Sequence, residues 1–142
     1  MHFISGGAFQ GKSKWVKEFY NLEGIPYQWI NGYTSEIYSI EKAYQGIFVI
    51  EGVERFVRQL QMDYGDQTRI EFSKNLLDWT KWEELSNENK LILIGCDINK
   101  GVVPINRDDR LWRDLVGWCY QDIVKIANRV EIVWCGLGEQ LK

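Results

Sequence analysis

Eight residues near the amino terminus combine glycine, lysine and serine at a spacing that suits phosphate capture. Residues 6–13 read GGAFQGKS and fit the pattern G-x-x-x-x-G-K-S without a mismatch. Glycines let the backbone aim successive N–H groups inward, and the loop then enters the positive end of a helix. In such a loop Lys12 reaches the β- and γ-phosphates of a nucleotide, and the Ser13 hydroxyl binds Mg²⁺. The predicted phosphate-binding residues are Gly6, Gly7, Ala8, Phe9, Gln10, Gly11, Lys12 and Ser13.

The same eight residues could form a glycine-rich turn that only resembles a P-loop. The flanking segments favour a true P-loop. His2 to Ser5 is a short apolar run of the kind that forms a buried strand. After the loop, apolar residues recur at helical spacing, at Trp15, Val16, Phe19 and Tyr20. Strand, loop and helix therefore follow in the order that nucleotide binding needs.

Two acids could complete a phosphoryl-transfer site. Glu51 directly follows the apolar run from Ile47 to Ile50, and Asp97 comes three residues after Ile94, which ends another such run. Ligands of open α/β sheets gather beyond the carboxyl ends of the strands, where both acids would project. Lys12, Glu51 and Asp97 are therefore the candidate catalytic residues, and Ser13 and Glu51 the candidate Mg²⁺ ligands. Either acid could instead open a surface loop, and the sequence does not decide which one is catalytic.

Short apolar runs alternate with helical segments along the whole chain, which is typical of an α/β layered domain. We expect residues 1–142 to form one domain, with a mainly parallel sheet between helix layers in a three-layer α/β/α arrangement. The remaining strands are expected at residues 26–30 and 130–135, and the helices at residues 35–44, 53–60, 68–85 and 107–128. Residues 62–67 are expected to form a loop.

Composition narrows the class of protein further. A net charge of −3 without a dense Lys/Arg cluster argues against nucleic-acid binding. No apolar run is long enough to span a membrane and no signal-peptide pattern appears, so we expect a cytoplasmic protein. The three cysteines, Cys96, Cys119 and Cys135, are expected to be buried reduced thiols.

Two groups of side chains remain open to more than one interpretation. Arg107 to Arg110, with Arg113, fit either a solvated helix start, in which Asp109 pairs with Arg113, or an arginine clamp on a phosphate. Packing explains most of the seven tryptophans, but an exposed Trp29, Trp79 or Trp82 could serve a ligand or a subunit contact.

The chain resembles the bifunctional adenosylcobinamide kinase / adenosylcobinamide-phosphate guanylyltransferase family of cobalamin biosynthesis. One block of similarity is the Gly-Gly-Ala opening and the Gly-Lys-Ser of the P-loop. A second block runs through residues 101–117, with Gly-Val-Val-Pro, Asn-Arg, an arginine ahead of Trp-Arg-Asp, and a glycine. It continues through Gln121, Ala127, Val130, Val133, Gly136 and the terminal Leu141 and Lys142.

The resemblance implies a RecA-like P-loop fold, ATP or GTP as substrate with Mg²⁺, a corrinoid-like second substrate and a homo-oligomer, often a trimer. This chain departs from the family in the middle, where it is shorter. The family carries there a histidine that becomes guanylylated, whereas residues 32–45 contain none and the only histidine is His2. The family's Asn-Glu after the fourth strand is Cys96-Asp97 here, while the acid after the third strand is kept as Glu51.

These observations together predict a nucleoside-triphosphate-dependent kinase that phosphorylates a hydroxyl of a corrinoid side chain and lacks guanylyltransferase activity. Two alternatives remain open. The first is a homologue that binds nucleotide without catalysis and acts as a sensor or assembly partner. The second is a small P-loop kinase that acts on an unrelated alcohol.

Overall fold

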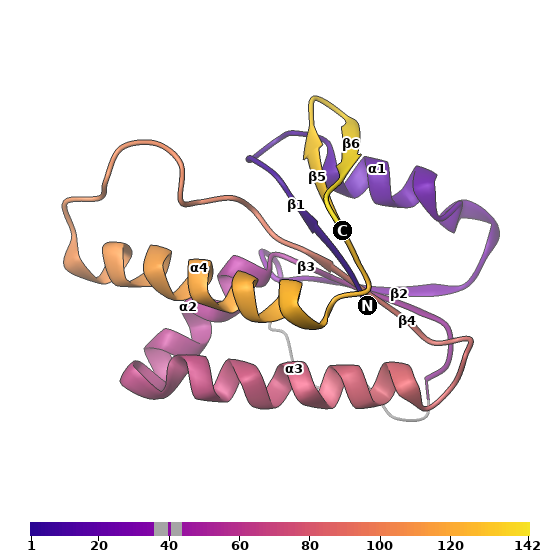
Figure 1. The fold of residues 1–142 in the computed structure, drawn as a ribbon, viewed down its shortest axis with the longest axis horizontal. Coiled ribbons are helices and arrows are strands. Elements are labelled where there is room, and N and C mark those ends of the chain that lie inside the picture. The colour runs from indigo at the N-terminus through magenta and orange to yellow at the C-terminus, as the bar shows by residue number, and fades with distance from the viewer. Residues whose placement is uncertain (36–39, 41–43) are drawn as a thin grey trace.

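The alternation of apolar runs and amphipathic segments produces a six-stranded sheet flanked by helices (Figure 1). The computed structural model describes residues 1–35, 40 and 44–142. The strands are β1 (His2–Ser5), β2 (Tyr27–Asn31), β3 (Ile47–Glu51), β4 (Lys90–Ile94), β5 (Arg129–Trp134) and β6 (Leu137–Gln140). The helices are α1 (Lys12–Phe19), α2 (Val53–Tyr64), α3 (Thr68–Glu84) and α4 (Arg107–Ile126), with short 3-10 helices at Leu22–Gly24 and Gly65–Gln67.

The strands lie in the order β2-β3-β4-β1-β5-β6, and every pair is parallel except β5 with β6. The predicted mainly parallel α/β sheet is therefore confirmed. β1, which leads into the P-loop, lies in the middle of the sheet, and β4 separates it from β3. In the register, Ile94 lies opposite Ile4 on one side and Glu51 on the other, so these strands end at the same edge.

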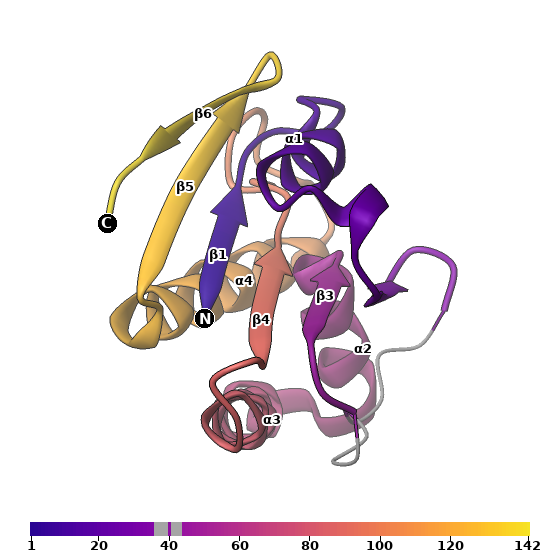
Figure 2. The same cartoon turned by 90° about the vertical axis from the view of Figure 1, so that its right-hand side faces the viewer.

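Strand periodicity divides the core between the two faces of the sheet, because successive side chains point to opposite sides. One set of strand side chains, which includes Phe3, Phe48 and Leu93, packs with α2, α3 and α4. The alternate set, which includes Ile4 and Ile92, packs with α1. Figure 2 shows this arrangement, with α1 alone on its face of the sheet. The P-loop therefore leads into the helix on the face of the sheet that fewer helices cover.

Three local predictions need correction or lie outside the described residues. The expected loop at residues 62–67 is helical, because α2 continues to Tyr64 and a 3-10 turn follows. The segment after Gly136 forms β6, which was not predicted as a strand. The helix expected at residues 35–44 falls mostly on residues that the structure does not describe.

Side-chain burial also corrects two expectations. Trp79 and Trp82 are each only 2% exposed and belong to the core, so packing accounts for both. Cys96 and Cys119 are buried as expected, but Cys135 is exposed in the turn between β5 and β6. Within the part of the chain that the structure describes, no helix has both the length and the apolar character needed to cross a bilayer.

Candidate functional site

The P-loop joins β1 to α1 in a conformation that two of its glycines permit. Gly6 lies so close to β5 that a Cβ there would come within 2.2 Å of the Val133 carbonyl oxygen. Gly11 is the N-cap of α1, with φ +86° in the left-handed region that favours glycine. Any larger residue at Gly6 would displace the loop from the sheet. The glycine spacing therefore reflects packing against β5 as well as room for phosphate.

The turn between β5 and β6 contacts the P-loop at Gln10. The Gly136 N–H donates to the Gln10 carbonyl at 2.8 Å, and the Cys135 N–H donates to Gln10 Oε1 at 2.7 Å. These contacts join residues more than 120 positions apart in the chain. The sequence does not predict this support, because no strand is expected after Gly136.

Lys12 begins α1 and turns its side chain back over the loop. Its ammonium group donates to the carbonyl oxygens of Gly6 at 3.0 Å and Gly7 at 2.7 Å. The positive charge therefore lies within the loop, beside the N-terminal end of a helix. Both features attract anions. The placement fits the predicted role of Lys12 toward nucleotide phosphates.

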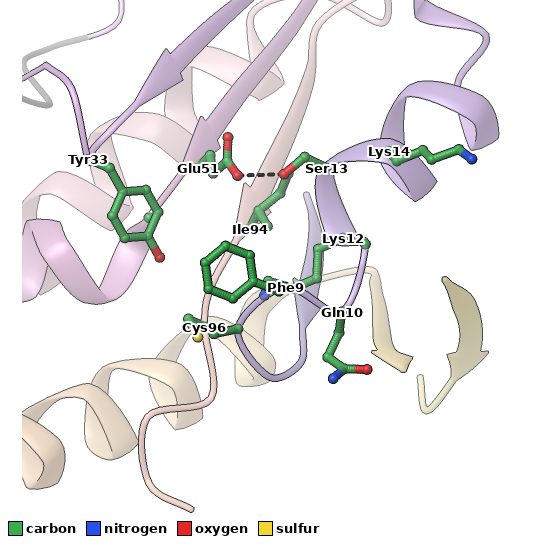
Figure 3. Close-up of a pocket in the computed structure, with 12 residues that line it drawn as sticks. Phe9, Gln10, Lys12, Ser13, Lys14, Tyr33, Glu51, Ile94 and Cys96 are labelled. Atoms are coloured by element: carbon green, nitrogen blue, oxygen red, sulfur yellow. Dashed lines mark hydrogen bonds between the residues drawn. The ribbon is translucent and has the colours of Figure 1, made fainter. Parts of the chain in front are cut away.

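Ser13 and Glu51 meet across the cavity (Figure 3), although they lie 38 residues apart. The Ser13 hydroxyl donates to Glu51 Oε1 at 2.5 Å. The Trp29 indole N–H donates to the other carboxylate oxygen at 3.0 Å, so β2 fixes the direction of the acid. A hydroxyl and a carboxylate are the oxygen ligands that Mg²⁺ prefers. The two residues predicted as Mg²⁺ ligands are thus adjacent, and their chemistry fits that ion.

Asp97 lies at the same edge of the sheet, but its carboxylate is turned elsewhere. One oxygen accepts from the Asn99 N–H at 3.1 Å, and the other pairs with Lys100 at 3.3 Å. The backbone N–H of Asp97 donates to the Gly6 carbonyl at 2.9 Å. Asp97 therefore supports the start of the P-loop through its backbone. Its side chain is not among those that line the cavity.

A cavity of about 580 Å³ opens beside the P-loop and extends across the ends of β4, β3 and β2. It is lined by Ala8, Phe9, Gln10, Gly11, Lys12, Ser13, Lys14, Tyr33, Glu51, Gly52, Ile94 and Cys96. The sequence reasoning missed Lys14, Tyr33, Gly52, Ile94 and Cys96. Tyr33 carries no local signal, because it follows β2 in an ordinary Asn-Gly turn. Gly52 directly follows a predicted buried strand and Cys96 comes two residues after another, so position alone could have found both.

A buried acid, Glu54, supports the far wall of this cavity. It is 1% exposed and accepts hydrogen bonds from the Tyr33 hydroxyl, from the Tyr120 hydroxyl at 3.2 Å and from the Cys96 N–H at 2.8 Å. Burial, reinforced by Glu54, raises the pKa of both tyrosines, so they remain protonated donors. Burial also raises the pKa of the Cys96 thiol. The network ties the ends of β2 and β4 to α2 and α4.

Arg110 and Arg113, near the start of α4, donate hydrogen bonds to backbone carbonyl oxygens of the preceding loop. Arg113 donates to the carbonyl oxygens of Val102, at 2.8 Å, and Asn99. Arg110 donates to the carbonyl oxygen of Pro104 at 3.0 Å. Asp109 pairs with Arg58 of α2 at 2.9 Å, and not with Arg113 as in the first of the two interpretations. The guanidinium groups of Arg110 and Arg113 therefore fasten the loop before α4, and neither lines the cavity beside the P-loop.

His2, the only histidine of the chain, lies at the other end of β1 from the P-loop. It is buried, with Nδ1 2.5 Å from the Tyr20 hydroxyl and Nε2 against the Glu131 carboxylate. Burial and the positive charges of Arg129, the N-terminal amine and Lys90 lower the pKa of His2 to about 4. Both ring nitrogens are thus engaged in the interior of the protein.

The parallel sheet and the GKS-containing loop that joins β1 to α1 define a protein of the P-loop NTPase-like α/β class. A sequence model of the cobinamide kinase / cobinamide phosphate guanyltransferase family, CobU, matches residues 27–141. The chain belongs to this family. The P-loop, at residues 6–13, precedes the matched residues.

A curated relative is similar over much of the chain. The bifunctional adenosylcobalamin biosynthesis protein CobU of Escherichia coli K12 is 27% identical over 105 residues. The match covers 68% of this chain and 58% of that protein, so the chain spans little more than half the length of the relative. The recognised resemblance to the family is thereby confirmed.

Proposed function

We propose that this protein is a nucleoside-triphosphate-dependent kinase that transfers a phosphoryl group to a hydroxyl on a corrinoid side chain. The observation that carries the proposal is the Ser13–Glu51 contact of 2.5 Å at the edge of a cavity beside the P-loop. It brings a hydroxyl, a carboxylate and the Lys12 ammonium around one space, as phosphoryl transfer requires. Membership of the family supports the choice of acceptor.

In the proposed reaction the acceptor oxygen forms a bond to the γ-phosphorus of ATP or GTP while the bond to the β–γ bridging oxygen breaks. The nucleoside diphosphate leaves, and the hydroxyl proton passes to Glu51 or to water. Lys12 stabilises the charge on the transferred group, and the loop N–H groups hold the phosphates. Ser13 and Glu51 would hold Mg²⁺, Glu51 through water, and that ion would neutralise phosphate charge.

Turnover with adenosylcobinamide tests the proposal directly. The purified protein is incubated with adenosylcobinamide, MgCl₂ and either ATP or GTP, and the products are identified by mass. We expect adenosylcobinamide phosphate together with the matching nucleoside diphosphate. Nucleotide binding without any phosphorylated acceptor would contradict the kinase assignment and favour a nucleotide-binding homologue. Phosphorylation of other alcohols, with the corrinoid untouched, would contradict the substrate.

Incubation with labelled GTP is expected to leave no acid-labile guanylyl group on the protein. In the family the guanylylated group is a histidine, whose imidazole nitrogen must reach the α-phosphate. His2 is buried in contact with Tyr20 and Glu131, and a four-residue strand of roughly 13 Å separates it from the loop. The measurement is label retained after denaturation. Retained label that disappears in His2→Ala would show that the guanylyl-transfer half of the chemistry persists on this imidazole.

A further inference from the structure

Phe9, in the middle of the P-loop, combines two features that folding does not explain. Its side chain is fully exposed to solvent, so it contributes no burial to the core. Its φ is +58°, in the left-handed region that residues with a Cβ rarely adopt. An exposed aromatic ring held on a strained backbone at a binding loop indicates a role in ligand contact.

The Phe9 ring lies in the part of the cavity where the acceptor would bind, away from the part that would hold the phosphates. The backbone of the loop, Lys12 and Ser13 occupy the phosphate end. Figure 3 shows the Phe9 ring turned toward Cys96, with Tyr33 across the cavity from it. In phosphoryl transfer the attacking and leaving oxygens lie roughly in line. The acceptor therefore approaches the γ-phosphate from the side away from the nucleoside diphosphate, through the space beyond Glu51.

Tyr33 provides a second aromatic wall whose position is fixed. Its hydroxyl donates to the buried Glu54, and a Cβ at Gly52 would come within 3.2 Å of its ring. Ile94 and Cys96 line the same cavity as the two aromatic rings. The cavity is thus apolar beyond the carboxylate of Glu51, with one ring held rigidly and the other free in solvent.

We infer that Phe9 and Tyr33 form the acceptor subsite, which takes a molecule that presents a flat or apolar face next to its reactive hydroxyl. The inference rests on the proposed kinase function. Phe9 closes over the apolar face of the acceptor, and Tyr33 supports the opposite side. Phe9 is then a specificity-determining residue for the acceptor, while its backbone serves the nucleotide.

Phe9→Ala tests this assignment, because alanine keeps a Cβ and therefore a similar backbone preference in the loop. We expect the KM for adenosylcobinamide to rise about tenfold or more, the effect of losing one buried aromatic contact. The affinity for ATP, measured by calorimetry without acceptor, should change less than twofold. Phe9→Tyr should restore the KM, since it restores the ring. Leu77→Ala, an exposed apolar residue on α3, is the matched control.

Three other results would contradict the inference, and each can be distinguished from the others. Weaker ATP binding by Phe9→Ala would place the ring on the nucleotide. An unchanged KM and unchanged ATP affinity would show that the ring contacts neither substrate, although the kinase function would stand. Failure of the unmodified protein to bind or phosphorylate adenosylcobinamide would remove the acceptor and the proposed function together.

Discussion

Replacement of Lys12 by alanine is expected to weaken the binding of ATP or GTP by about 10- to 150-fold. Hydrogen bonds to charged groups contribute about 1.5–3 kcal/mol each, and 1.4 kcal/mol corresponds to a tenfold change in affinity. Lys12 is the cation that lies within the loop, where its ammonium group bonds to the carbonyls of Gly6 and Gly7. The backbone N–H groups remain in Lys12→Ala, so some phosphate binding should persist.

Calorimetric titration with each nucleotide measures this effect. Lys74→Ala is the matched control, since Lys74 lies on α3 and is paired with Glu71 away from the cavity. Circular dichroism of Lys12→Ala should match that of the unmodified protein, because the lysine contributes to no core cluster. Unchanged nucleotide affinity in a folded Lys12→Ala would remove the P-loop hypothesis.

The features that could be predicted from sequence are those that depend on local pattern. The apolar run at Leu91 to Ile94 is buried on both sides of a parallel sheet, so its strand is visible without knowledge of its neighbours. The P-loop is likewise contiguous, and its glycines carry the signal. The expected order of strand, loop and helix holds for β1 and α1 within a residue or two.

Pairings between distant segments could not be predicted in the same way. All four residues of β6 are exposed and show no apolar alternation, so only the pairing with β5 reveals this strand. The contacts of Gln10 with the hairpin depend on that pairing. The same holds for Trp29, whose indole reaches Glu51 only because β2 and β3 are neighbours in the sheet.

The two candidate acids show that sequence predicts the position of a residue but not the direction of its side chain. Sequence places both Glu51 and Asp97 just past buried strands, and the structure puts both at one edge of the sheet. Side-chain direction then separates them. Glu51 is the last residue of β3 and points into the cavity, whereas Asp97 follows three residues after β4, where the chain has already turned. That turn carries no readable signal in the sequence.

Glu51→Gln is expected to retain nucleotide binding and to lower Mg²⁺-dependent turnover by on the order of 100-fold or more, the range for loss of one acid–base group. The amide keeps the shape of the side chain, but it carries no charge to balance Mg²⁺ or to accept a proton. Ser13 and Trp29 donate to different oxygens of the carboxylate, and the amide keeps only one of those two acceptors. Rates at several Mg²⁺ concentrations, with ATP affinity measured separately, test both parts of the expectation.

Asp97→Asn is the comparison that distinguishes the two acids. Its carbonyl oxygen can still accept from the Asn99 N–H, and only the exposed pair with Lys100 is lost, so turnover should fall less than about threefold. The reverse pattern, with turnover lost in Asp97→Asn and kept in Glu51→Gln, would assign the catalytic acid to the end of β4. It would require the Asp97 side chain to leave Lys100 and turn into the cavity when substrates bind. Equal turnover in both variants would mean that neither carboxylate takes part in the chemistry, and Lys12 and the loop backbone would then carry it.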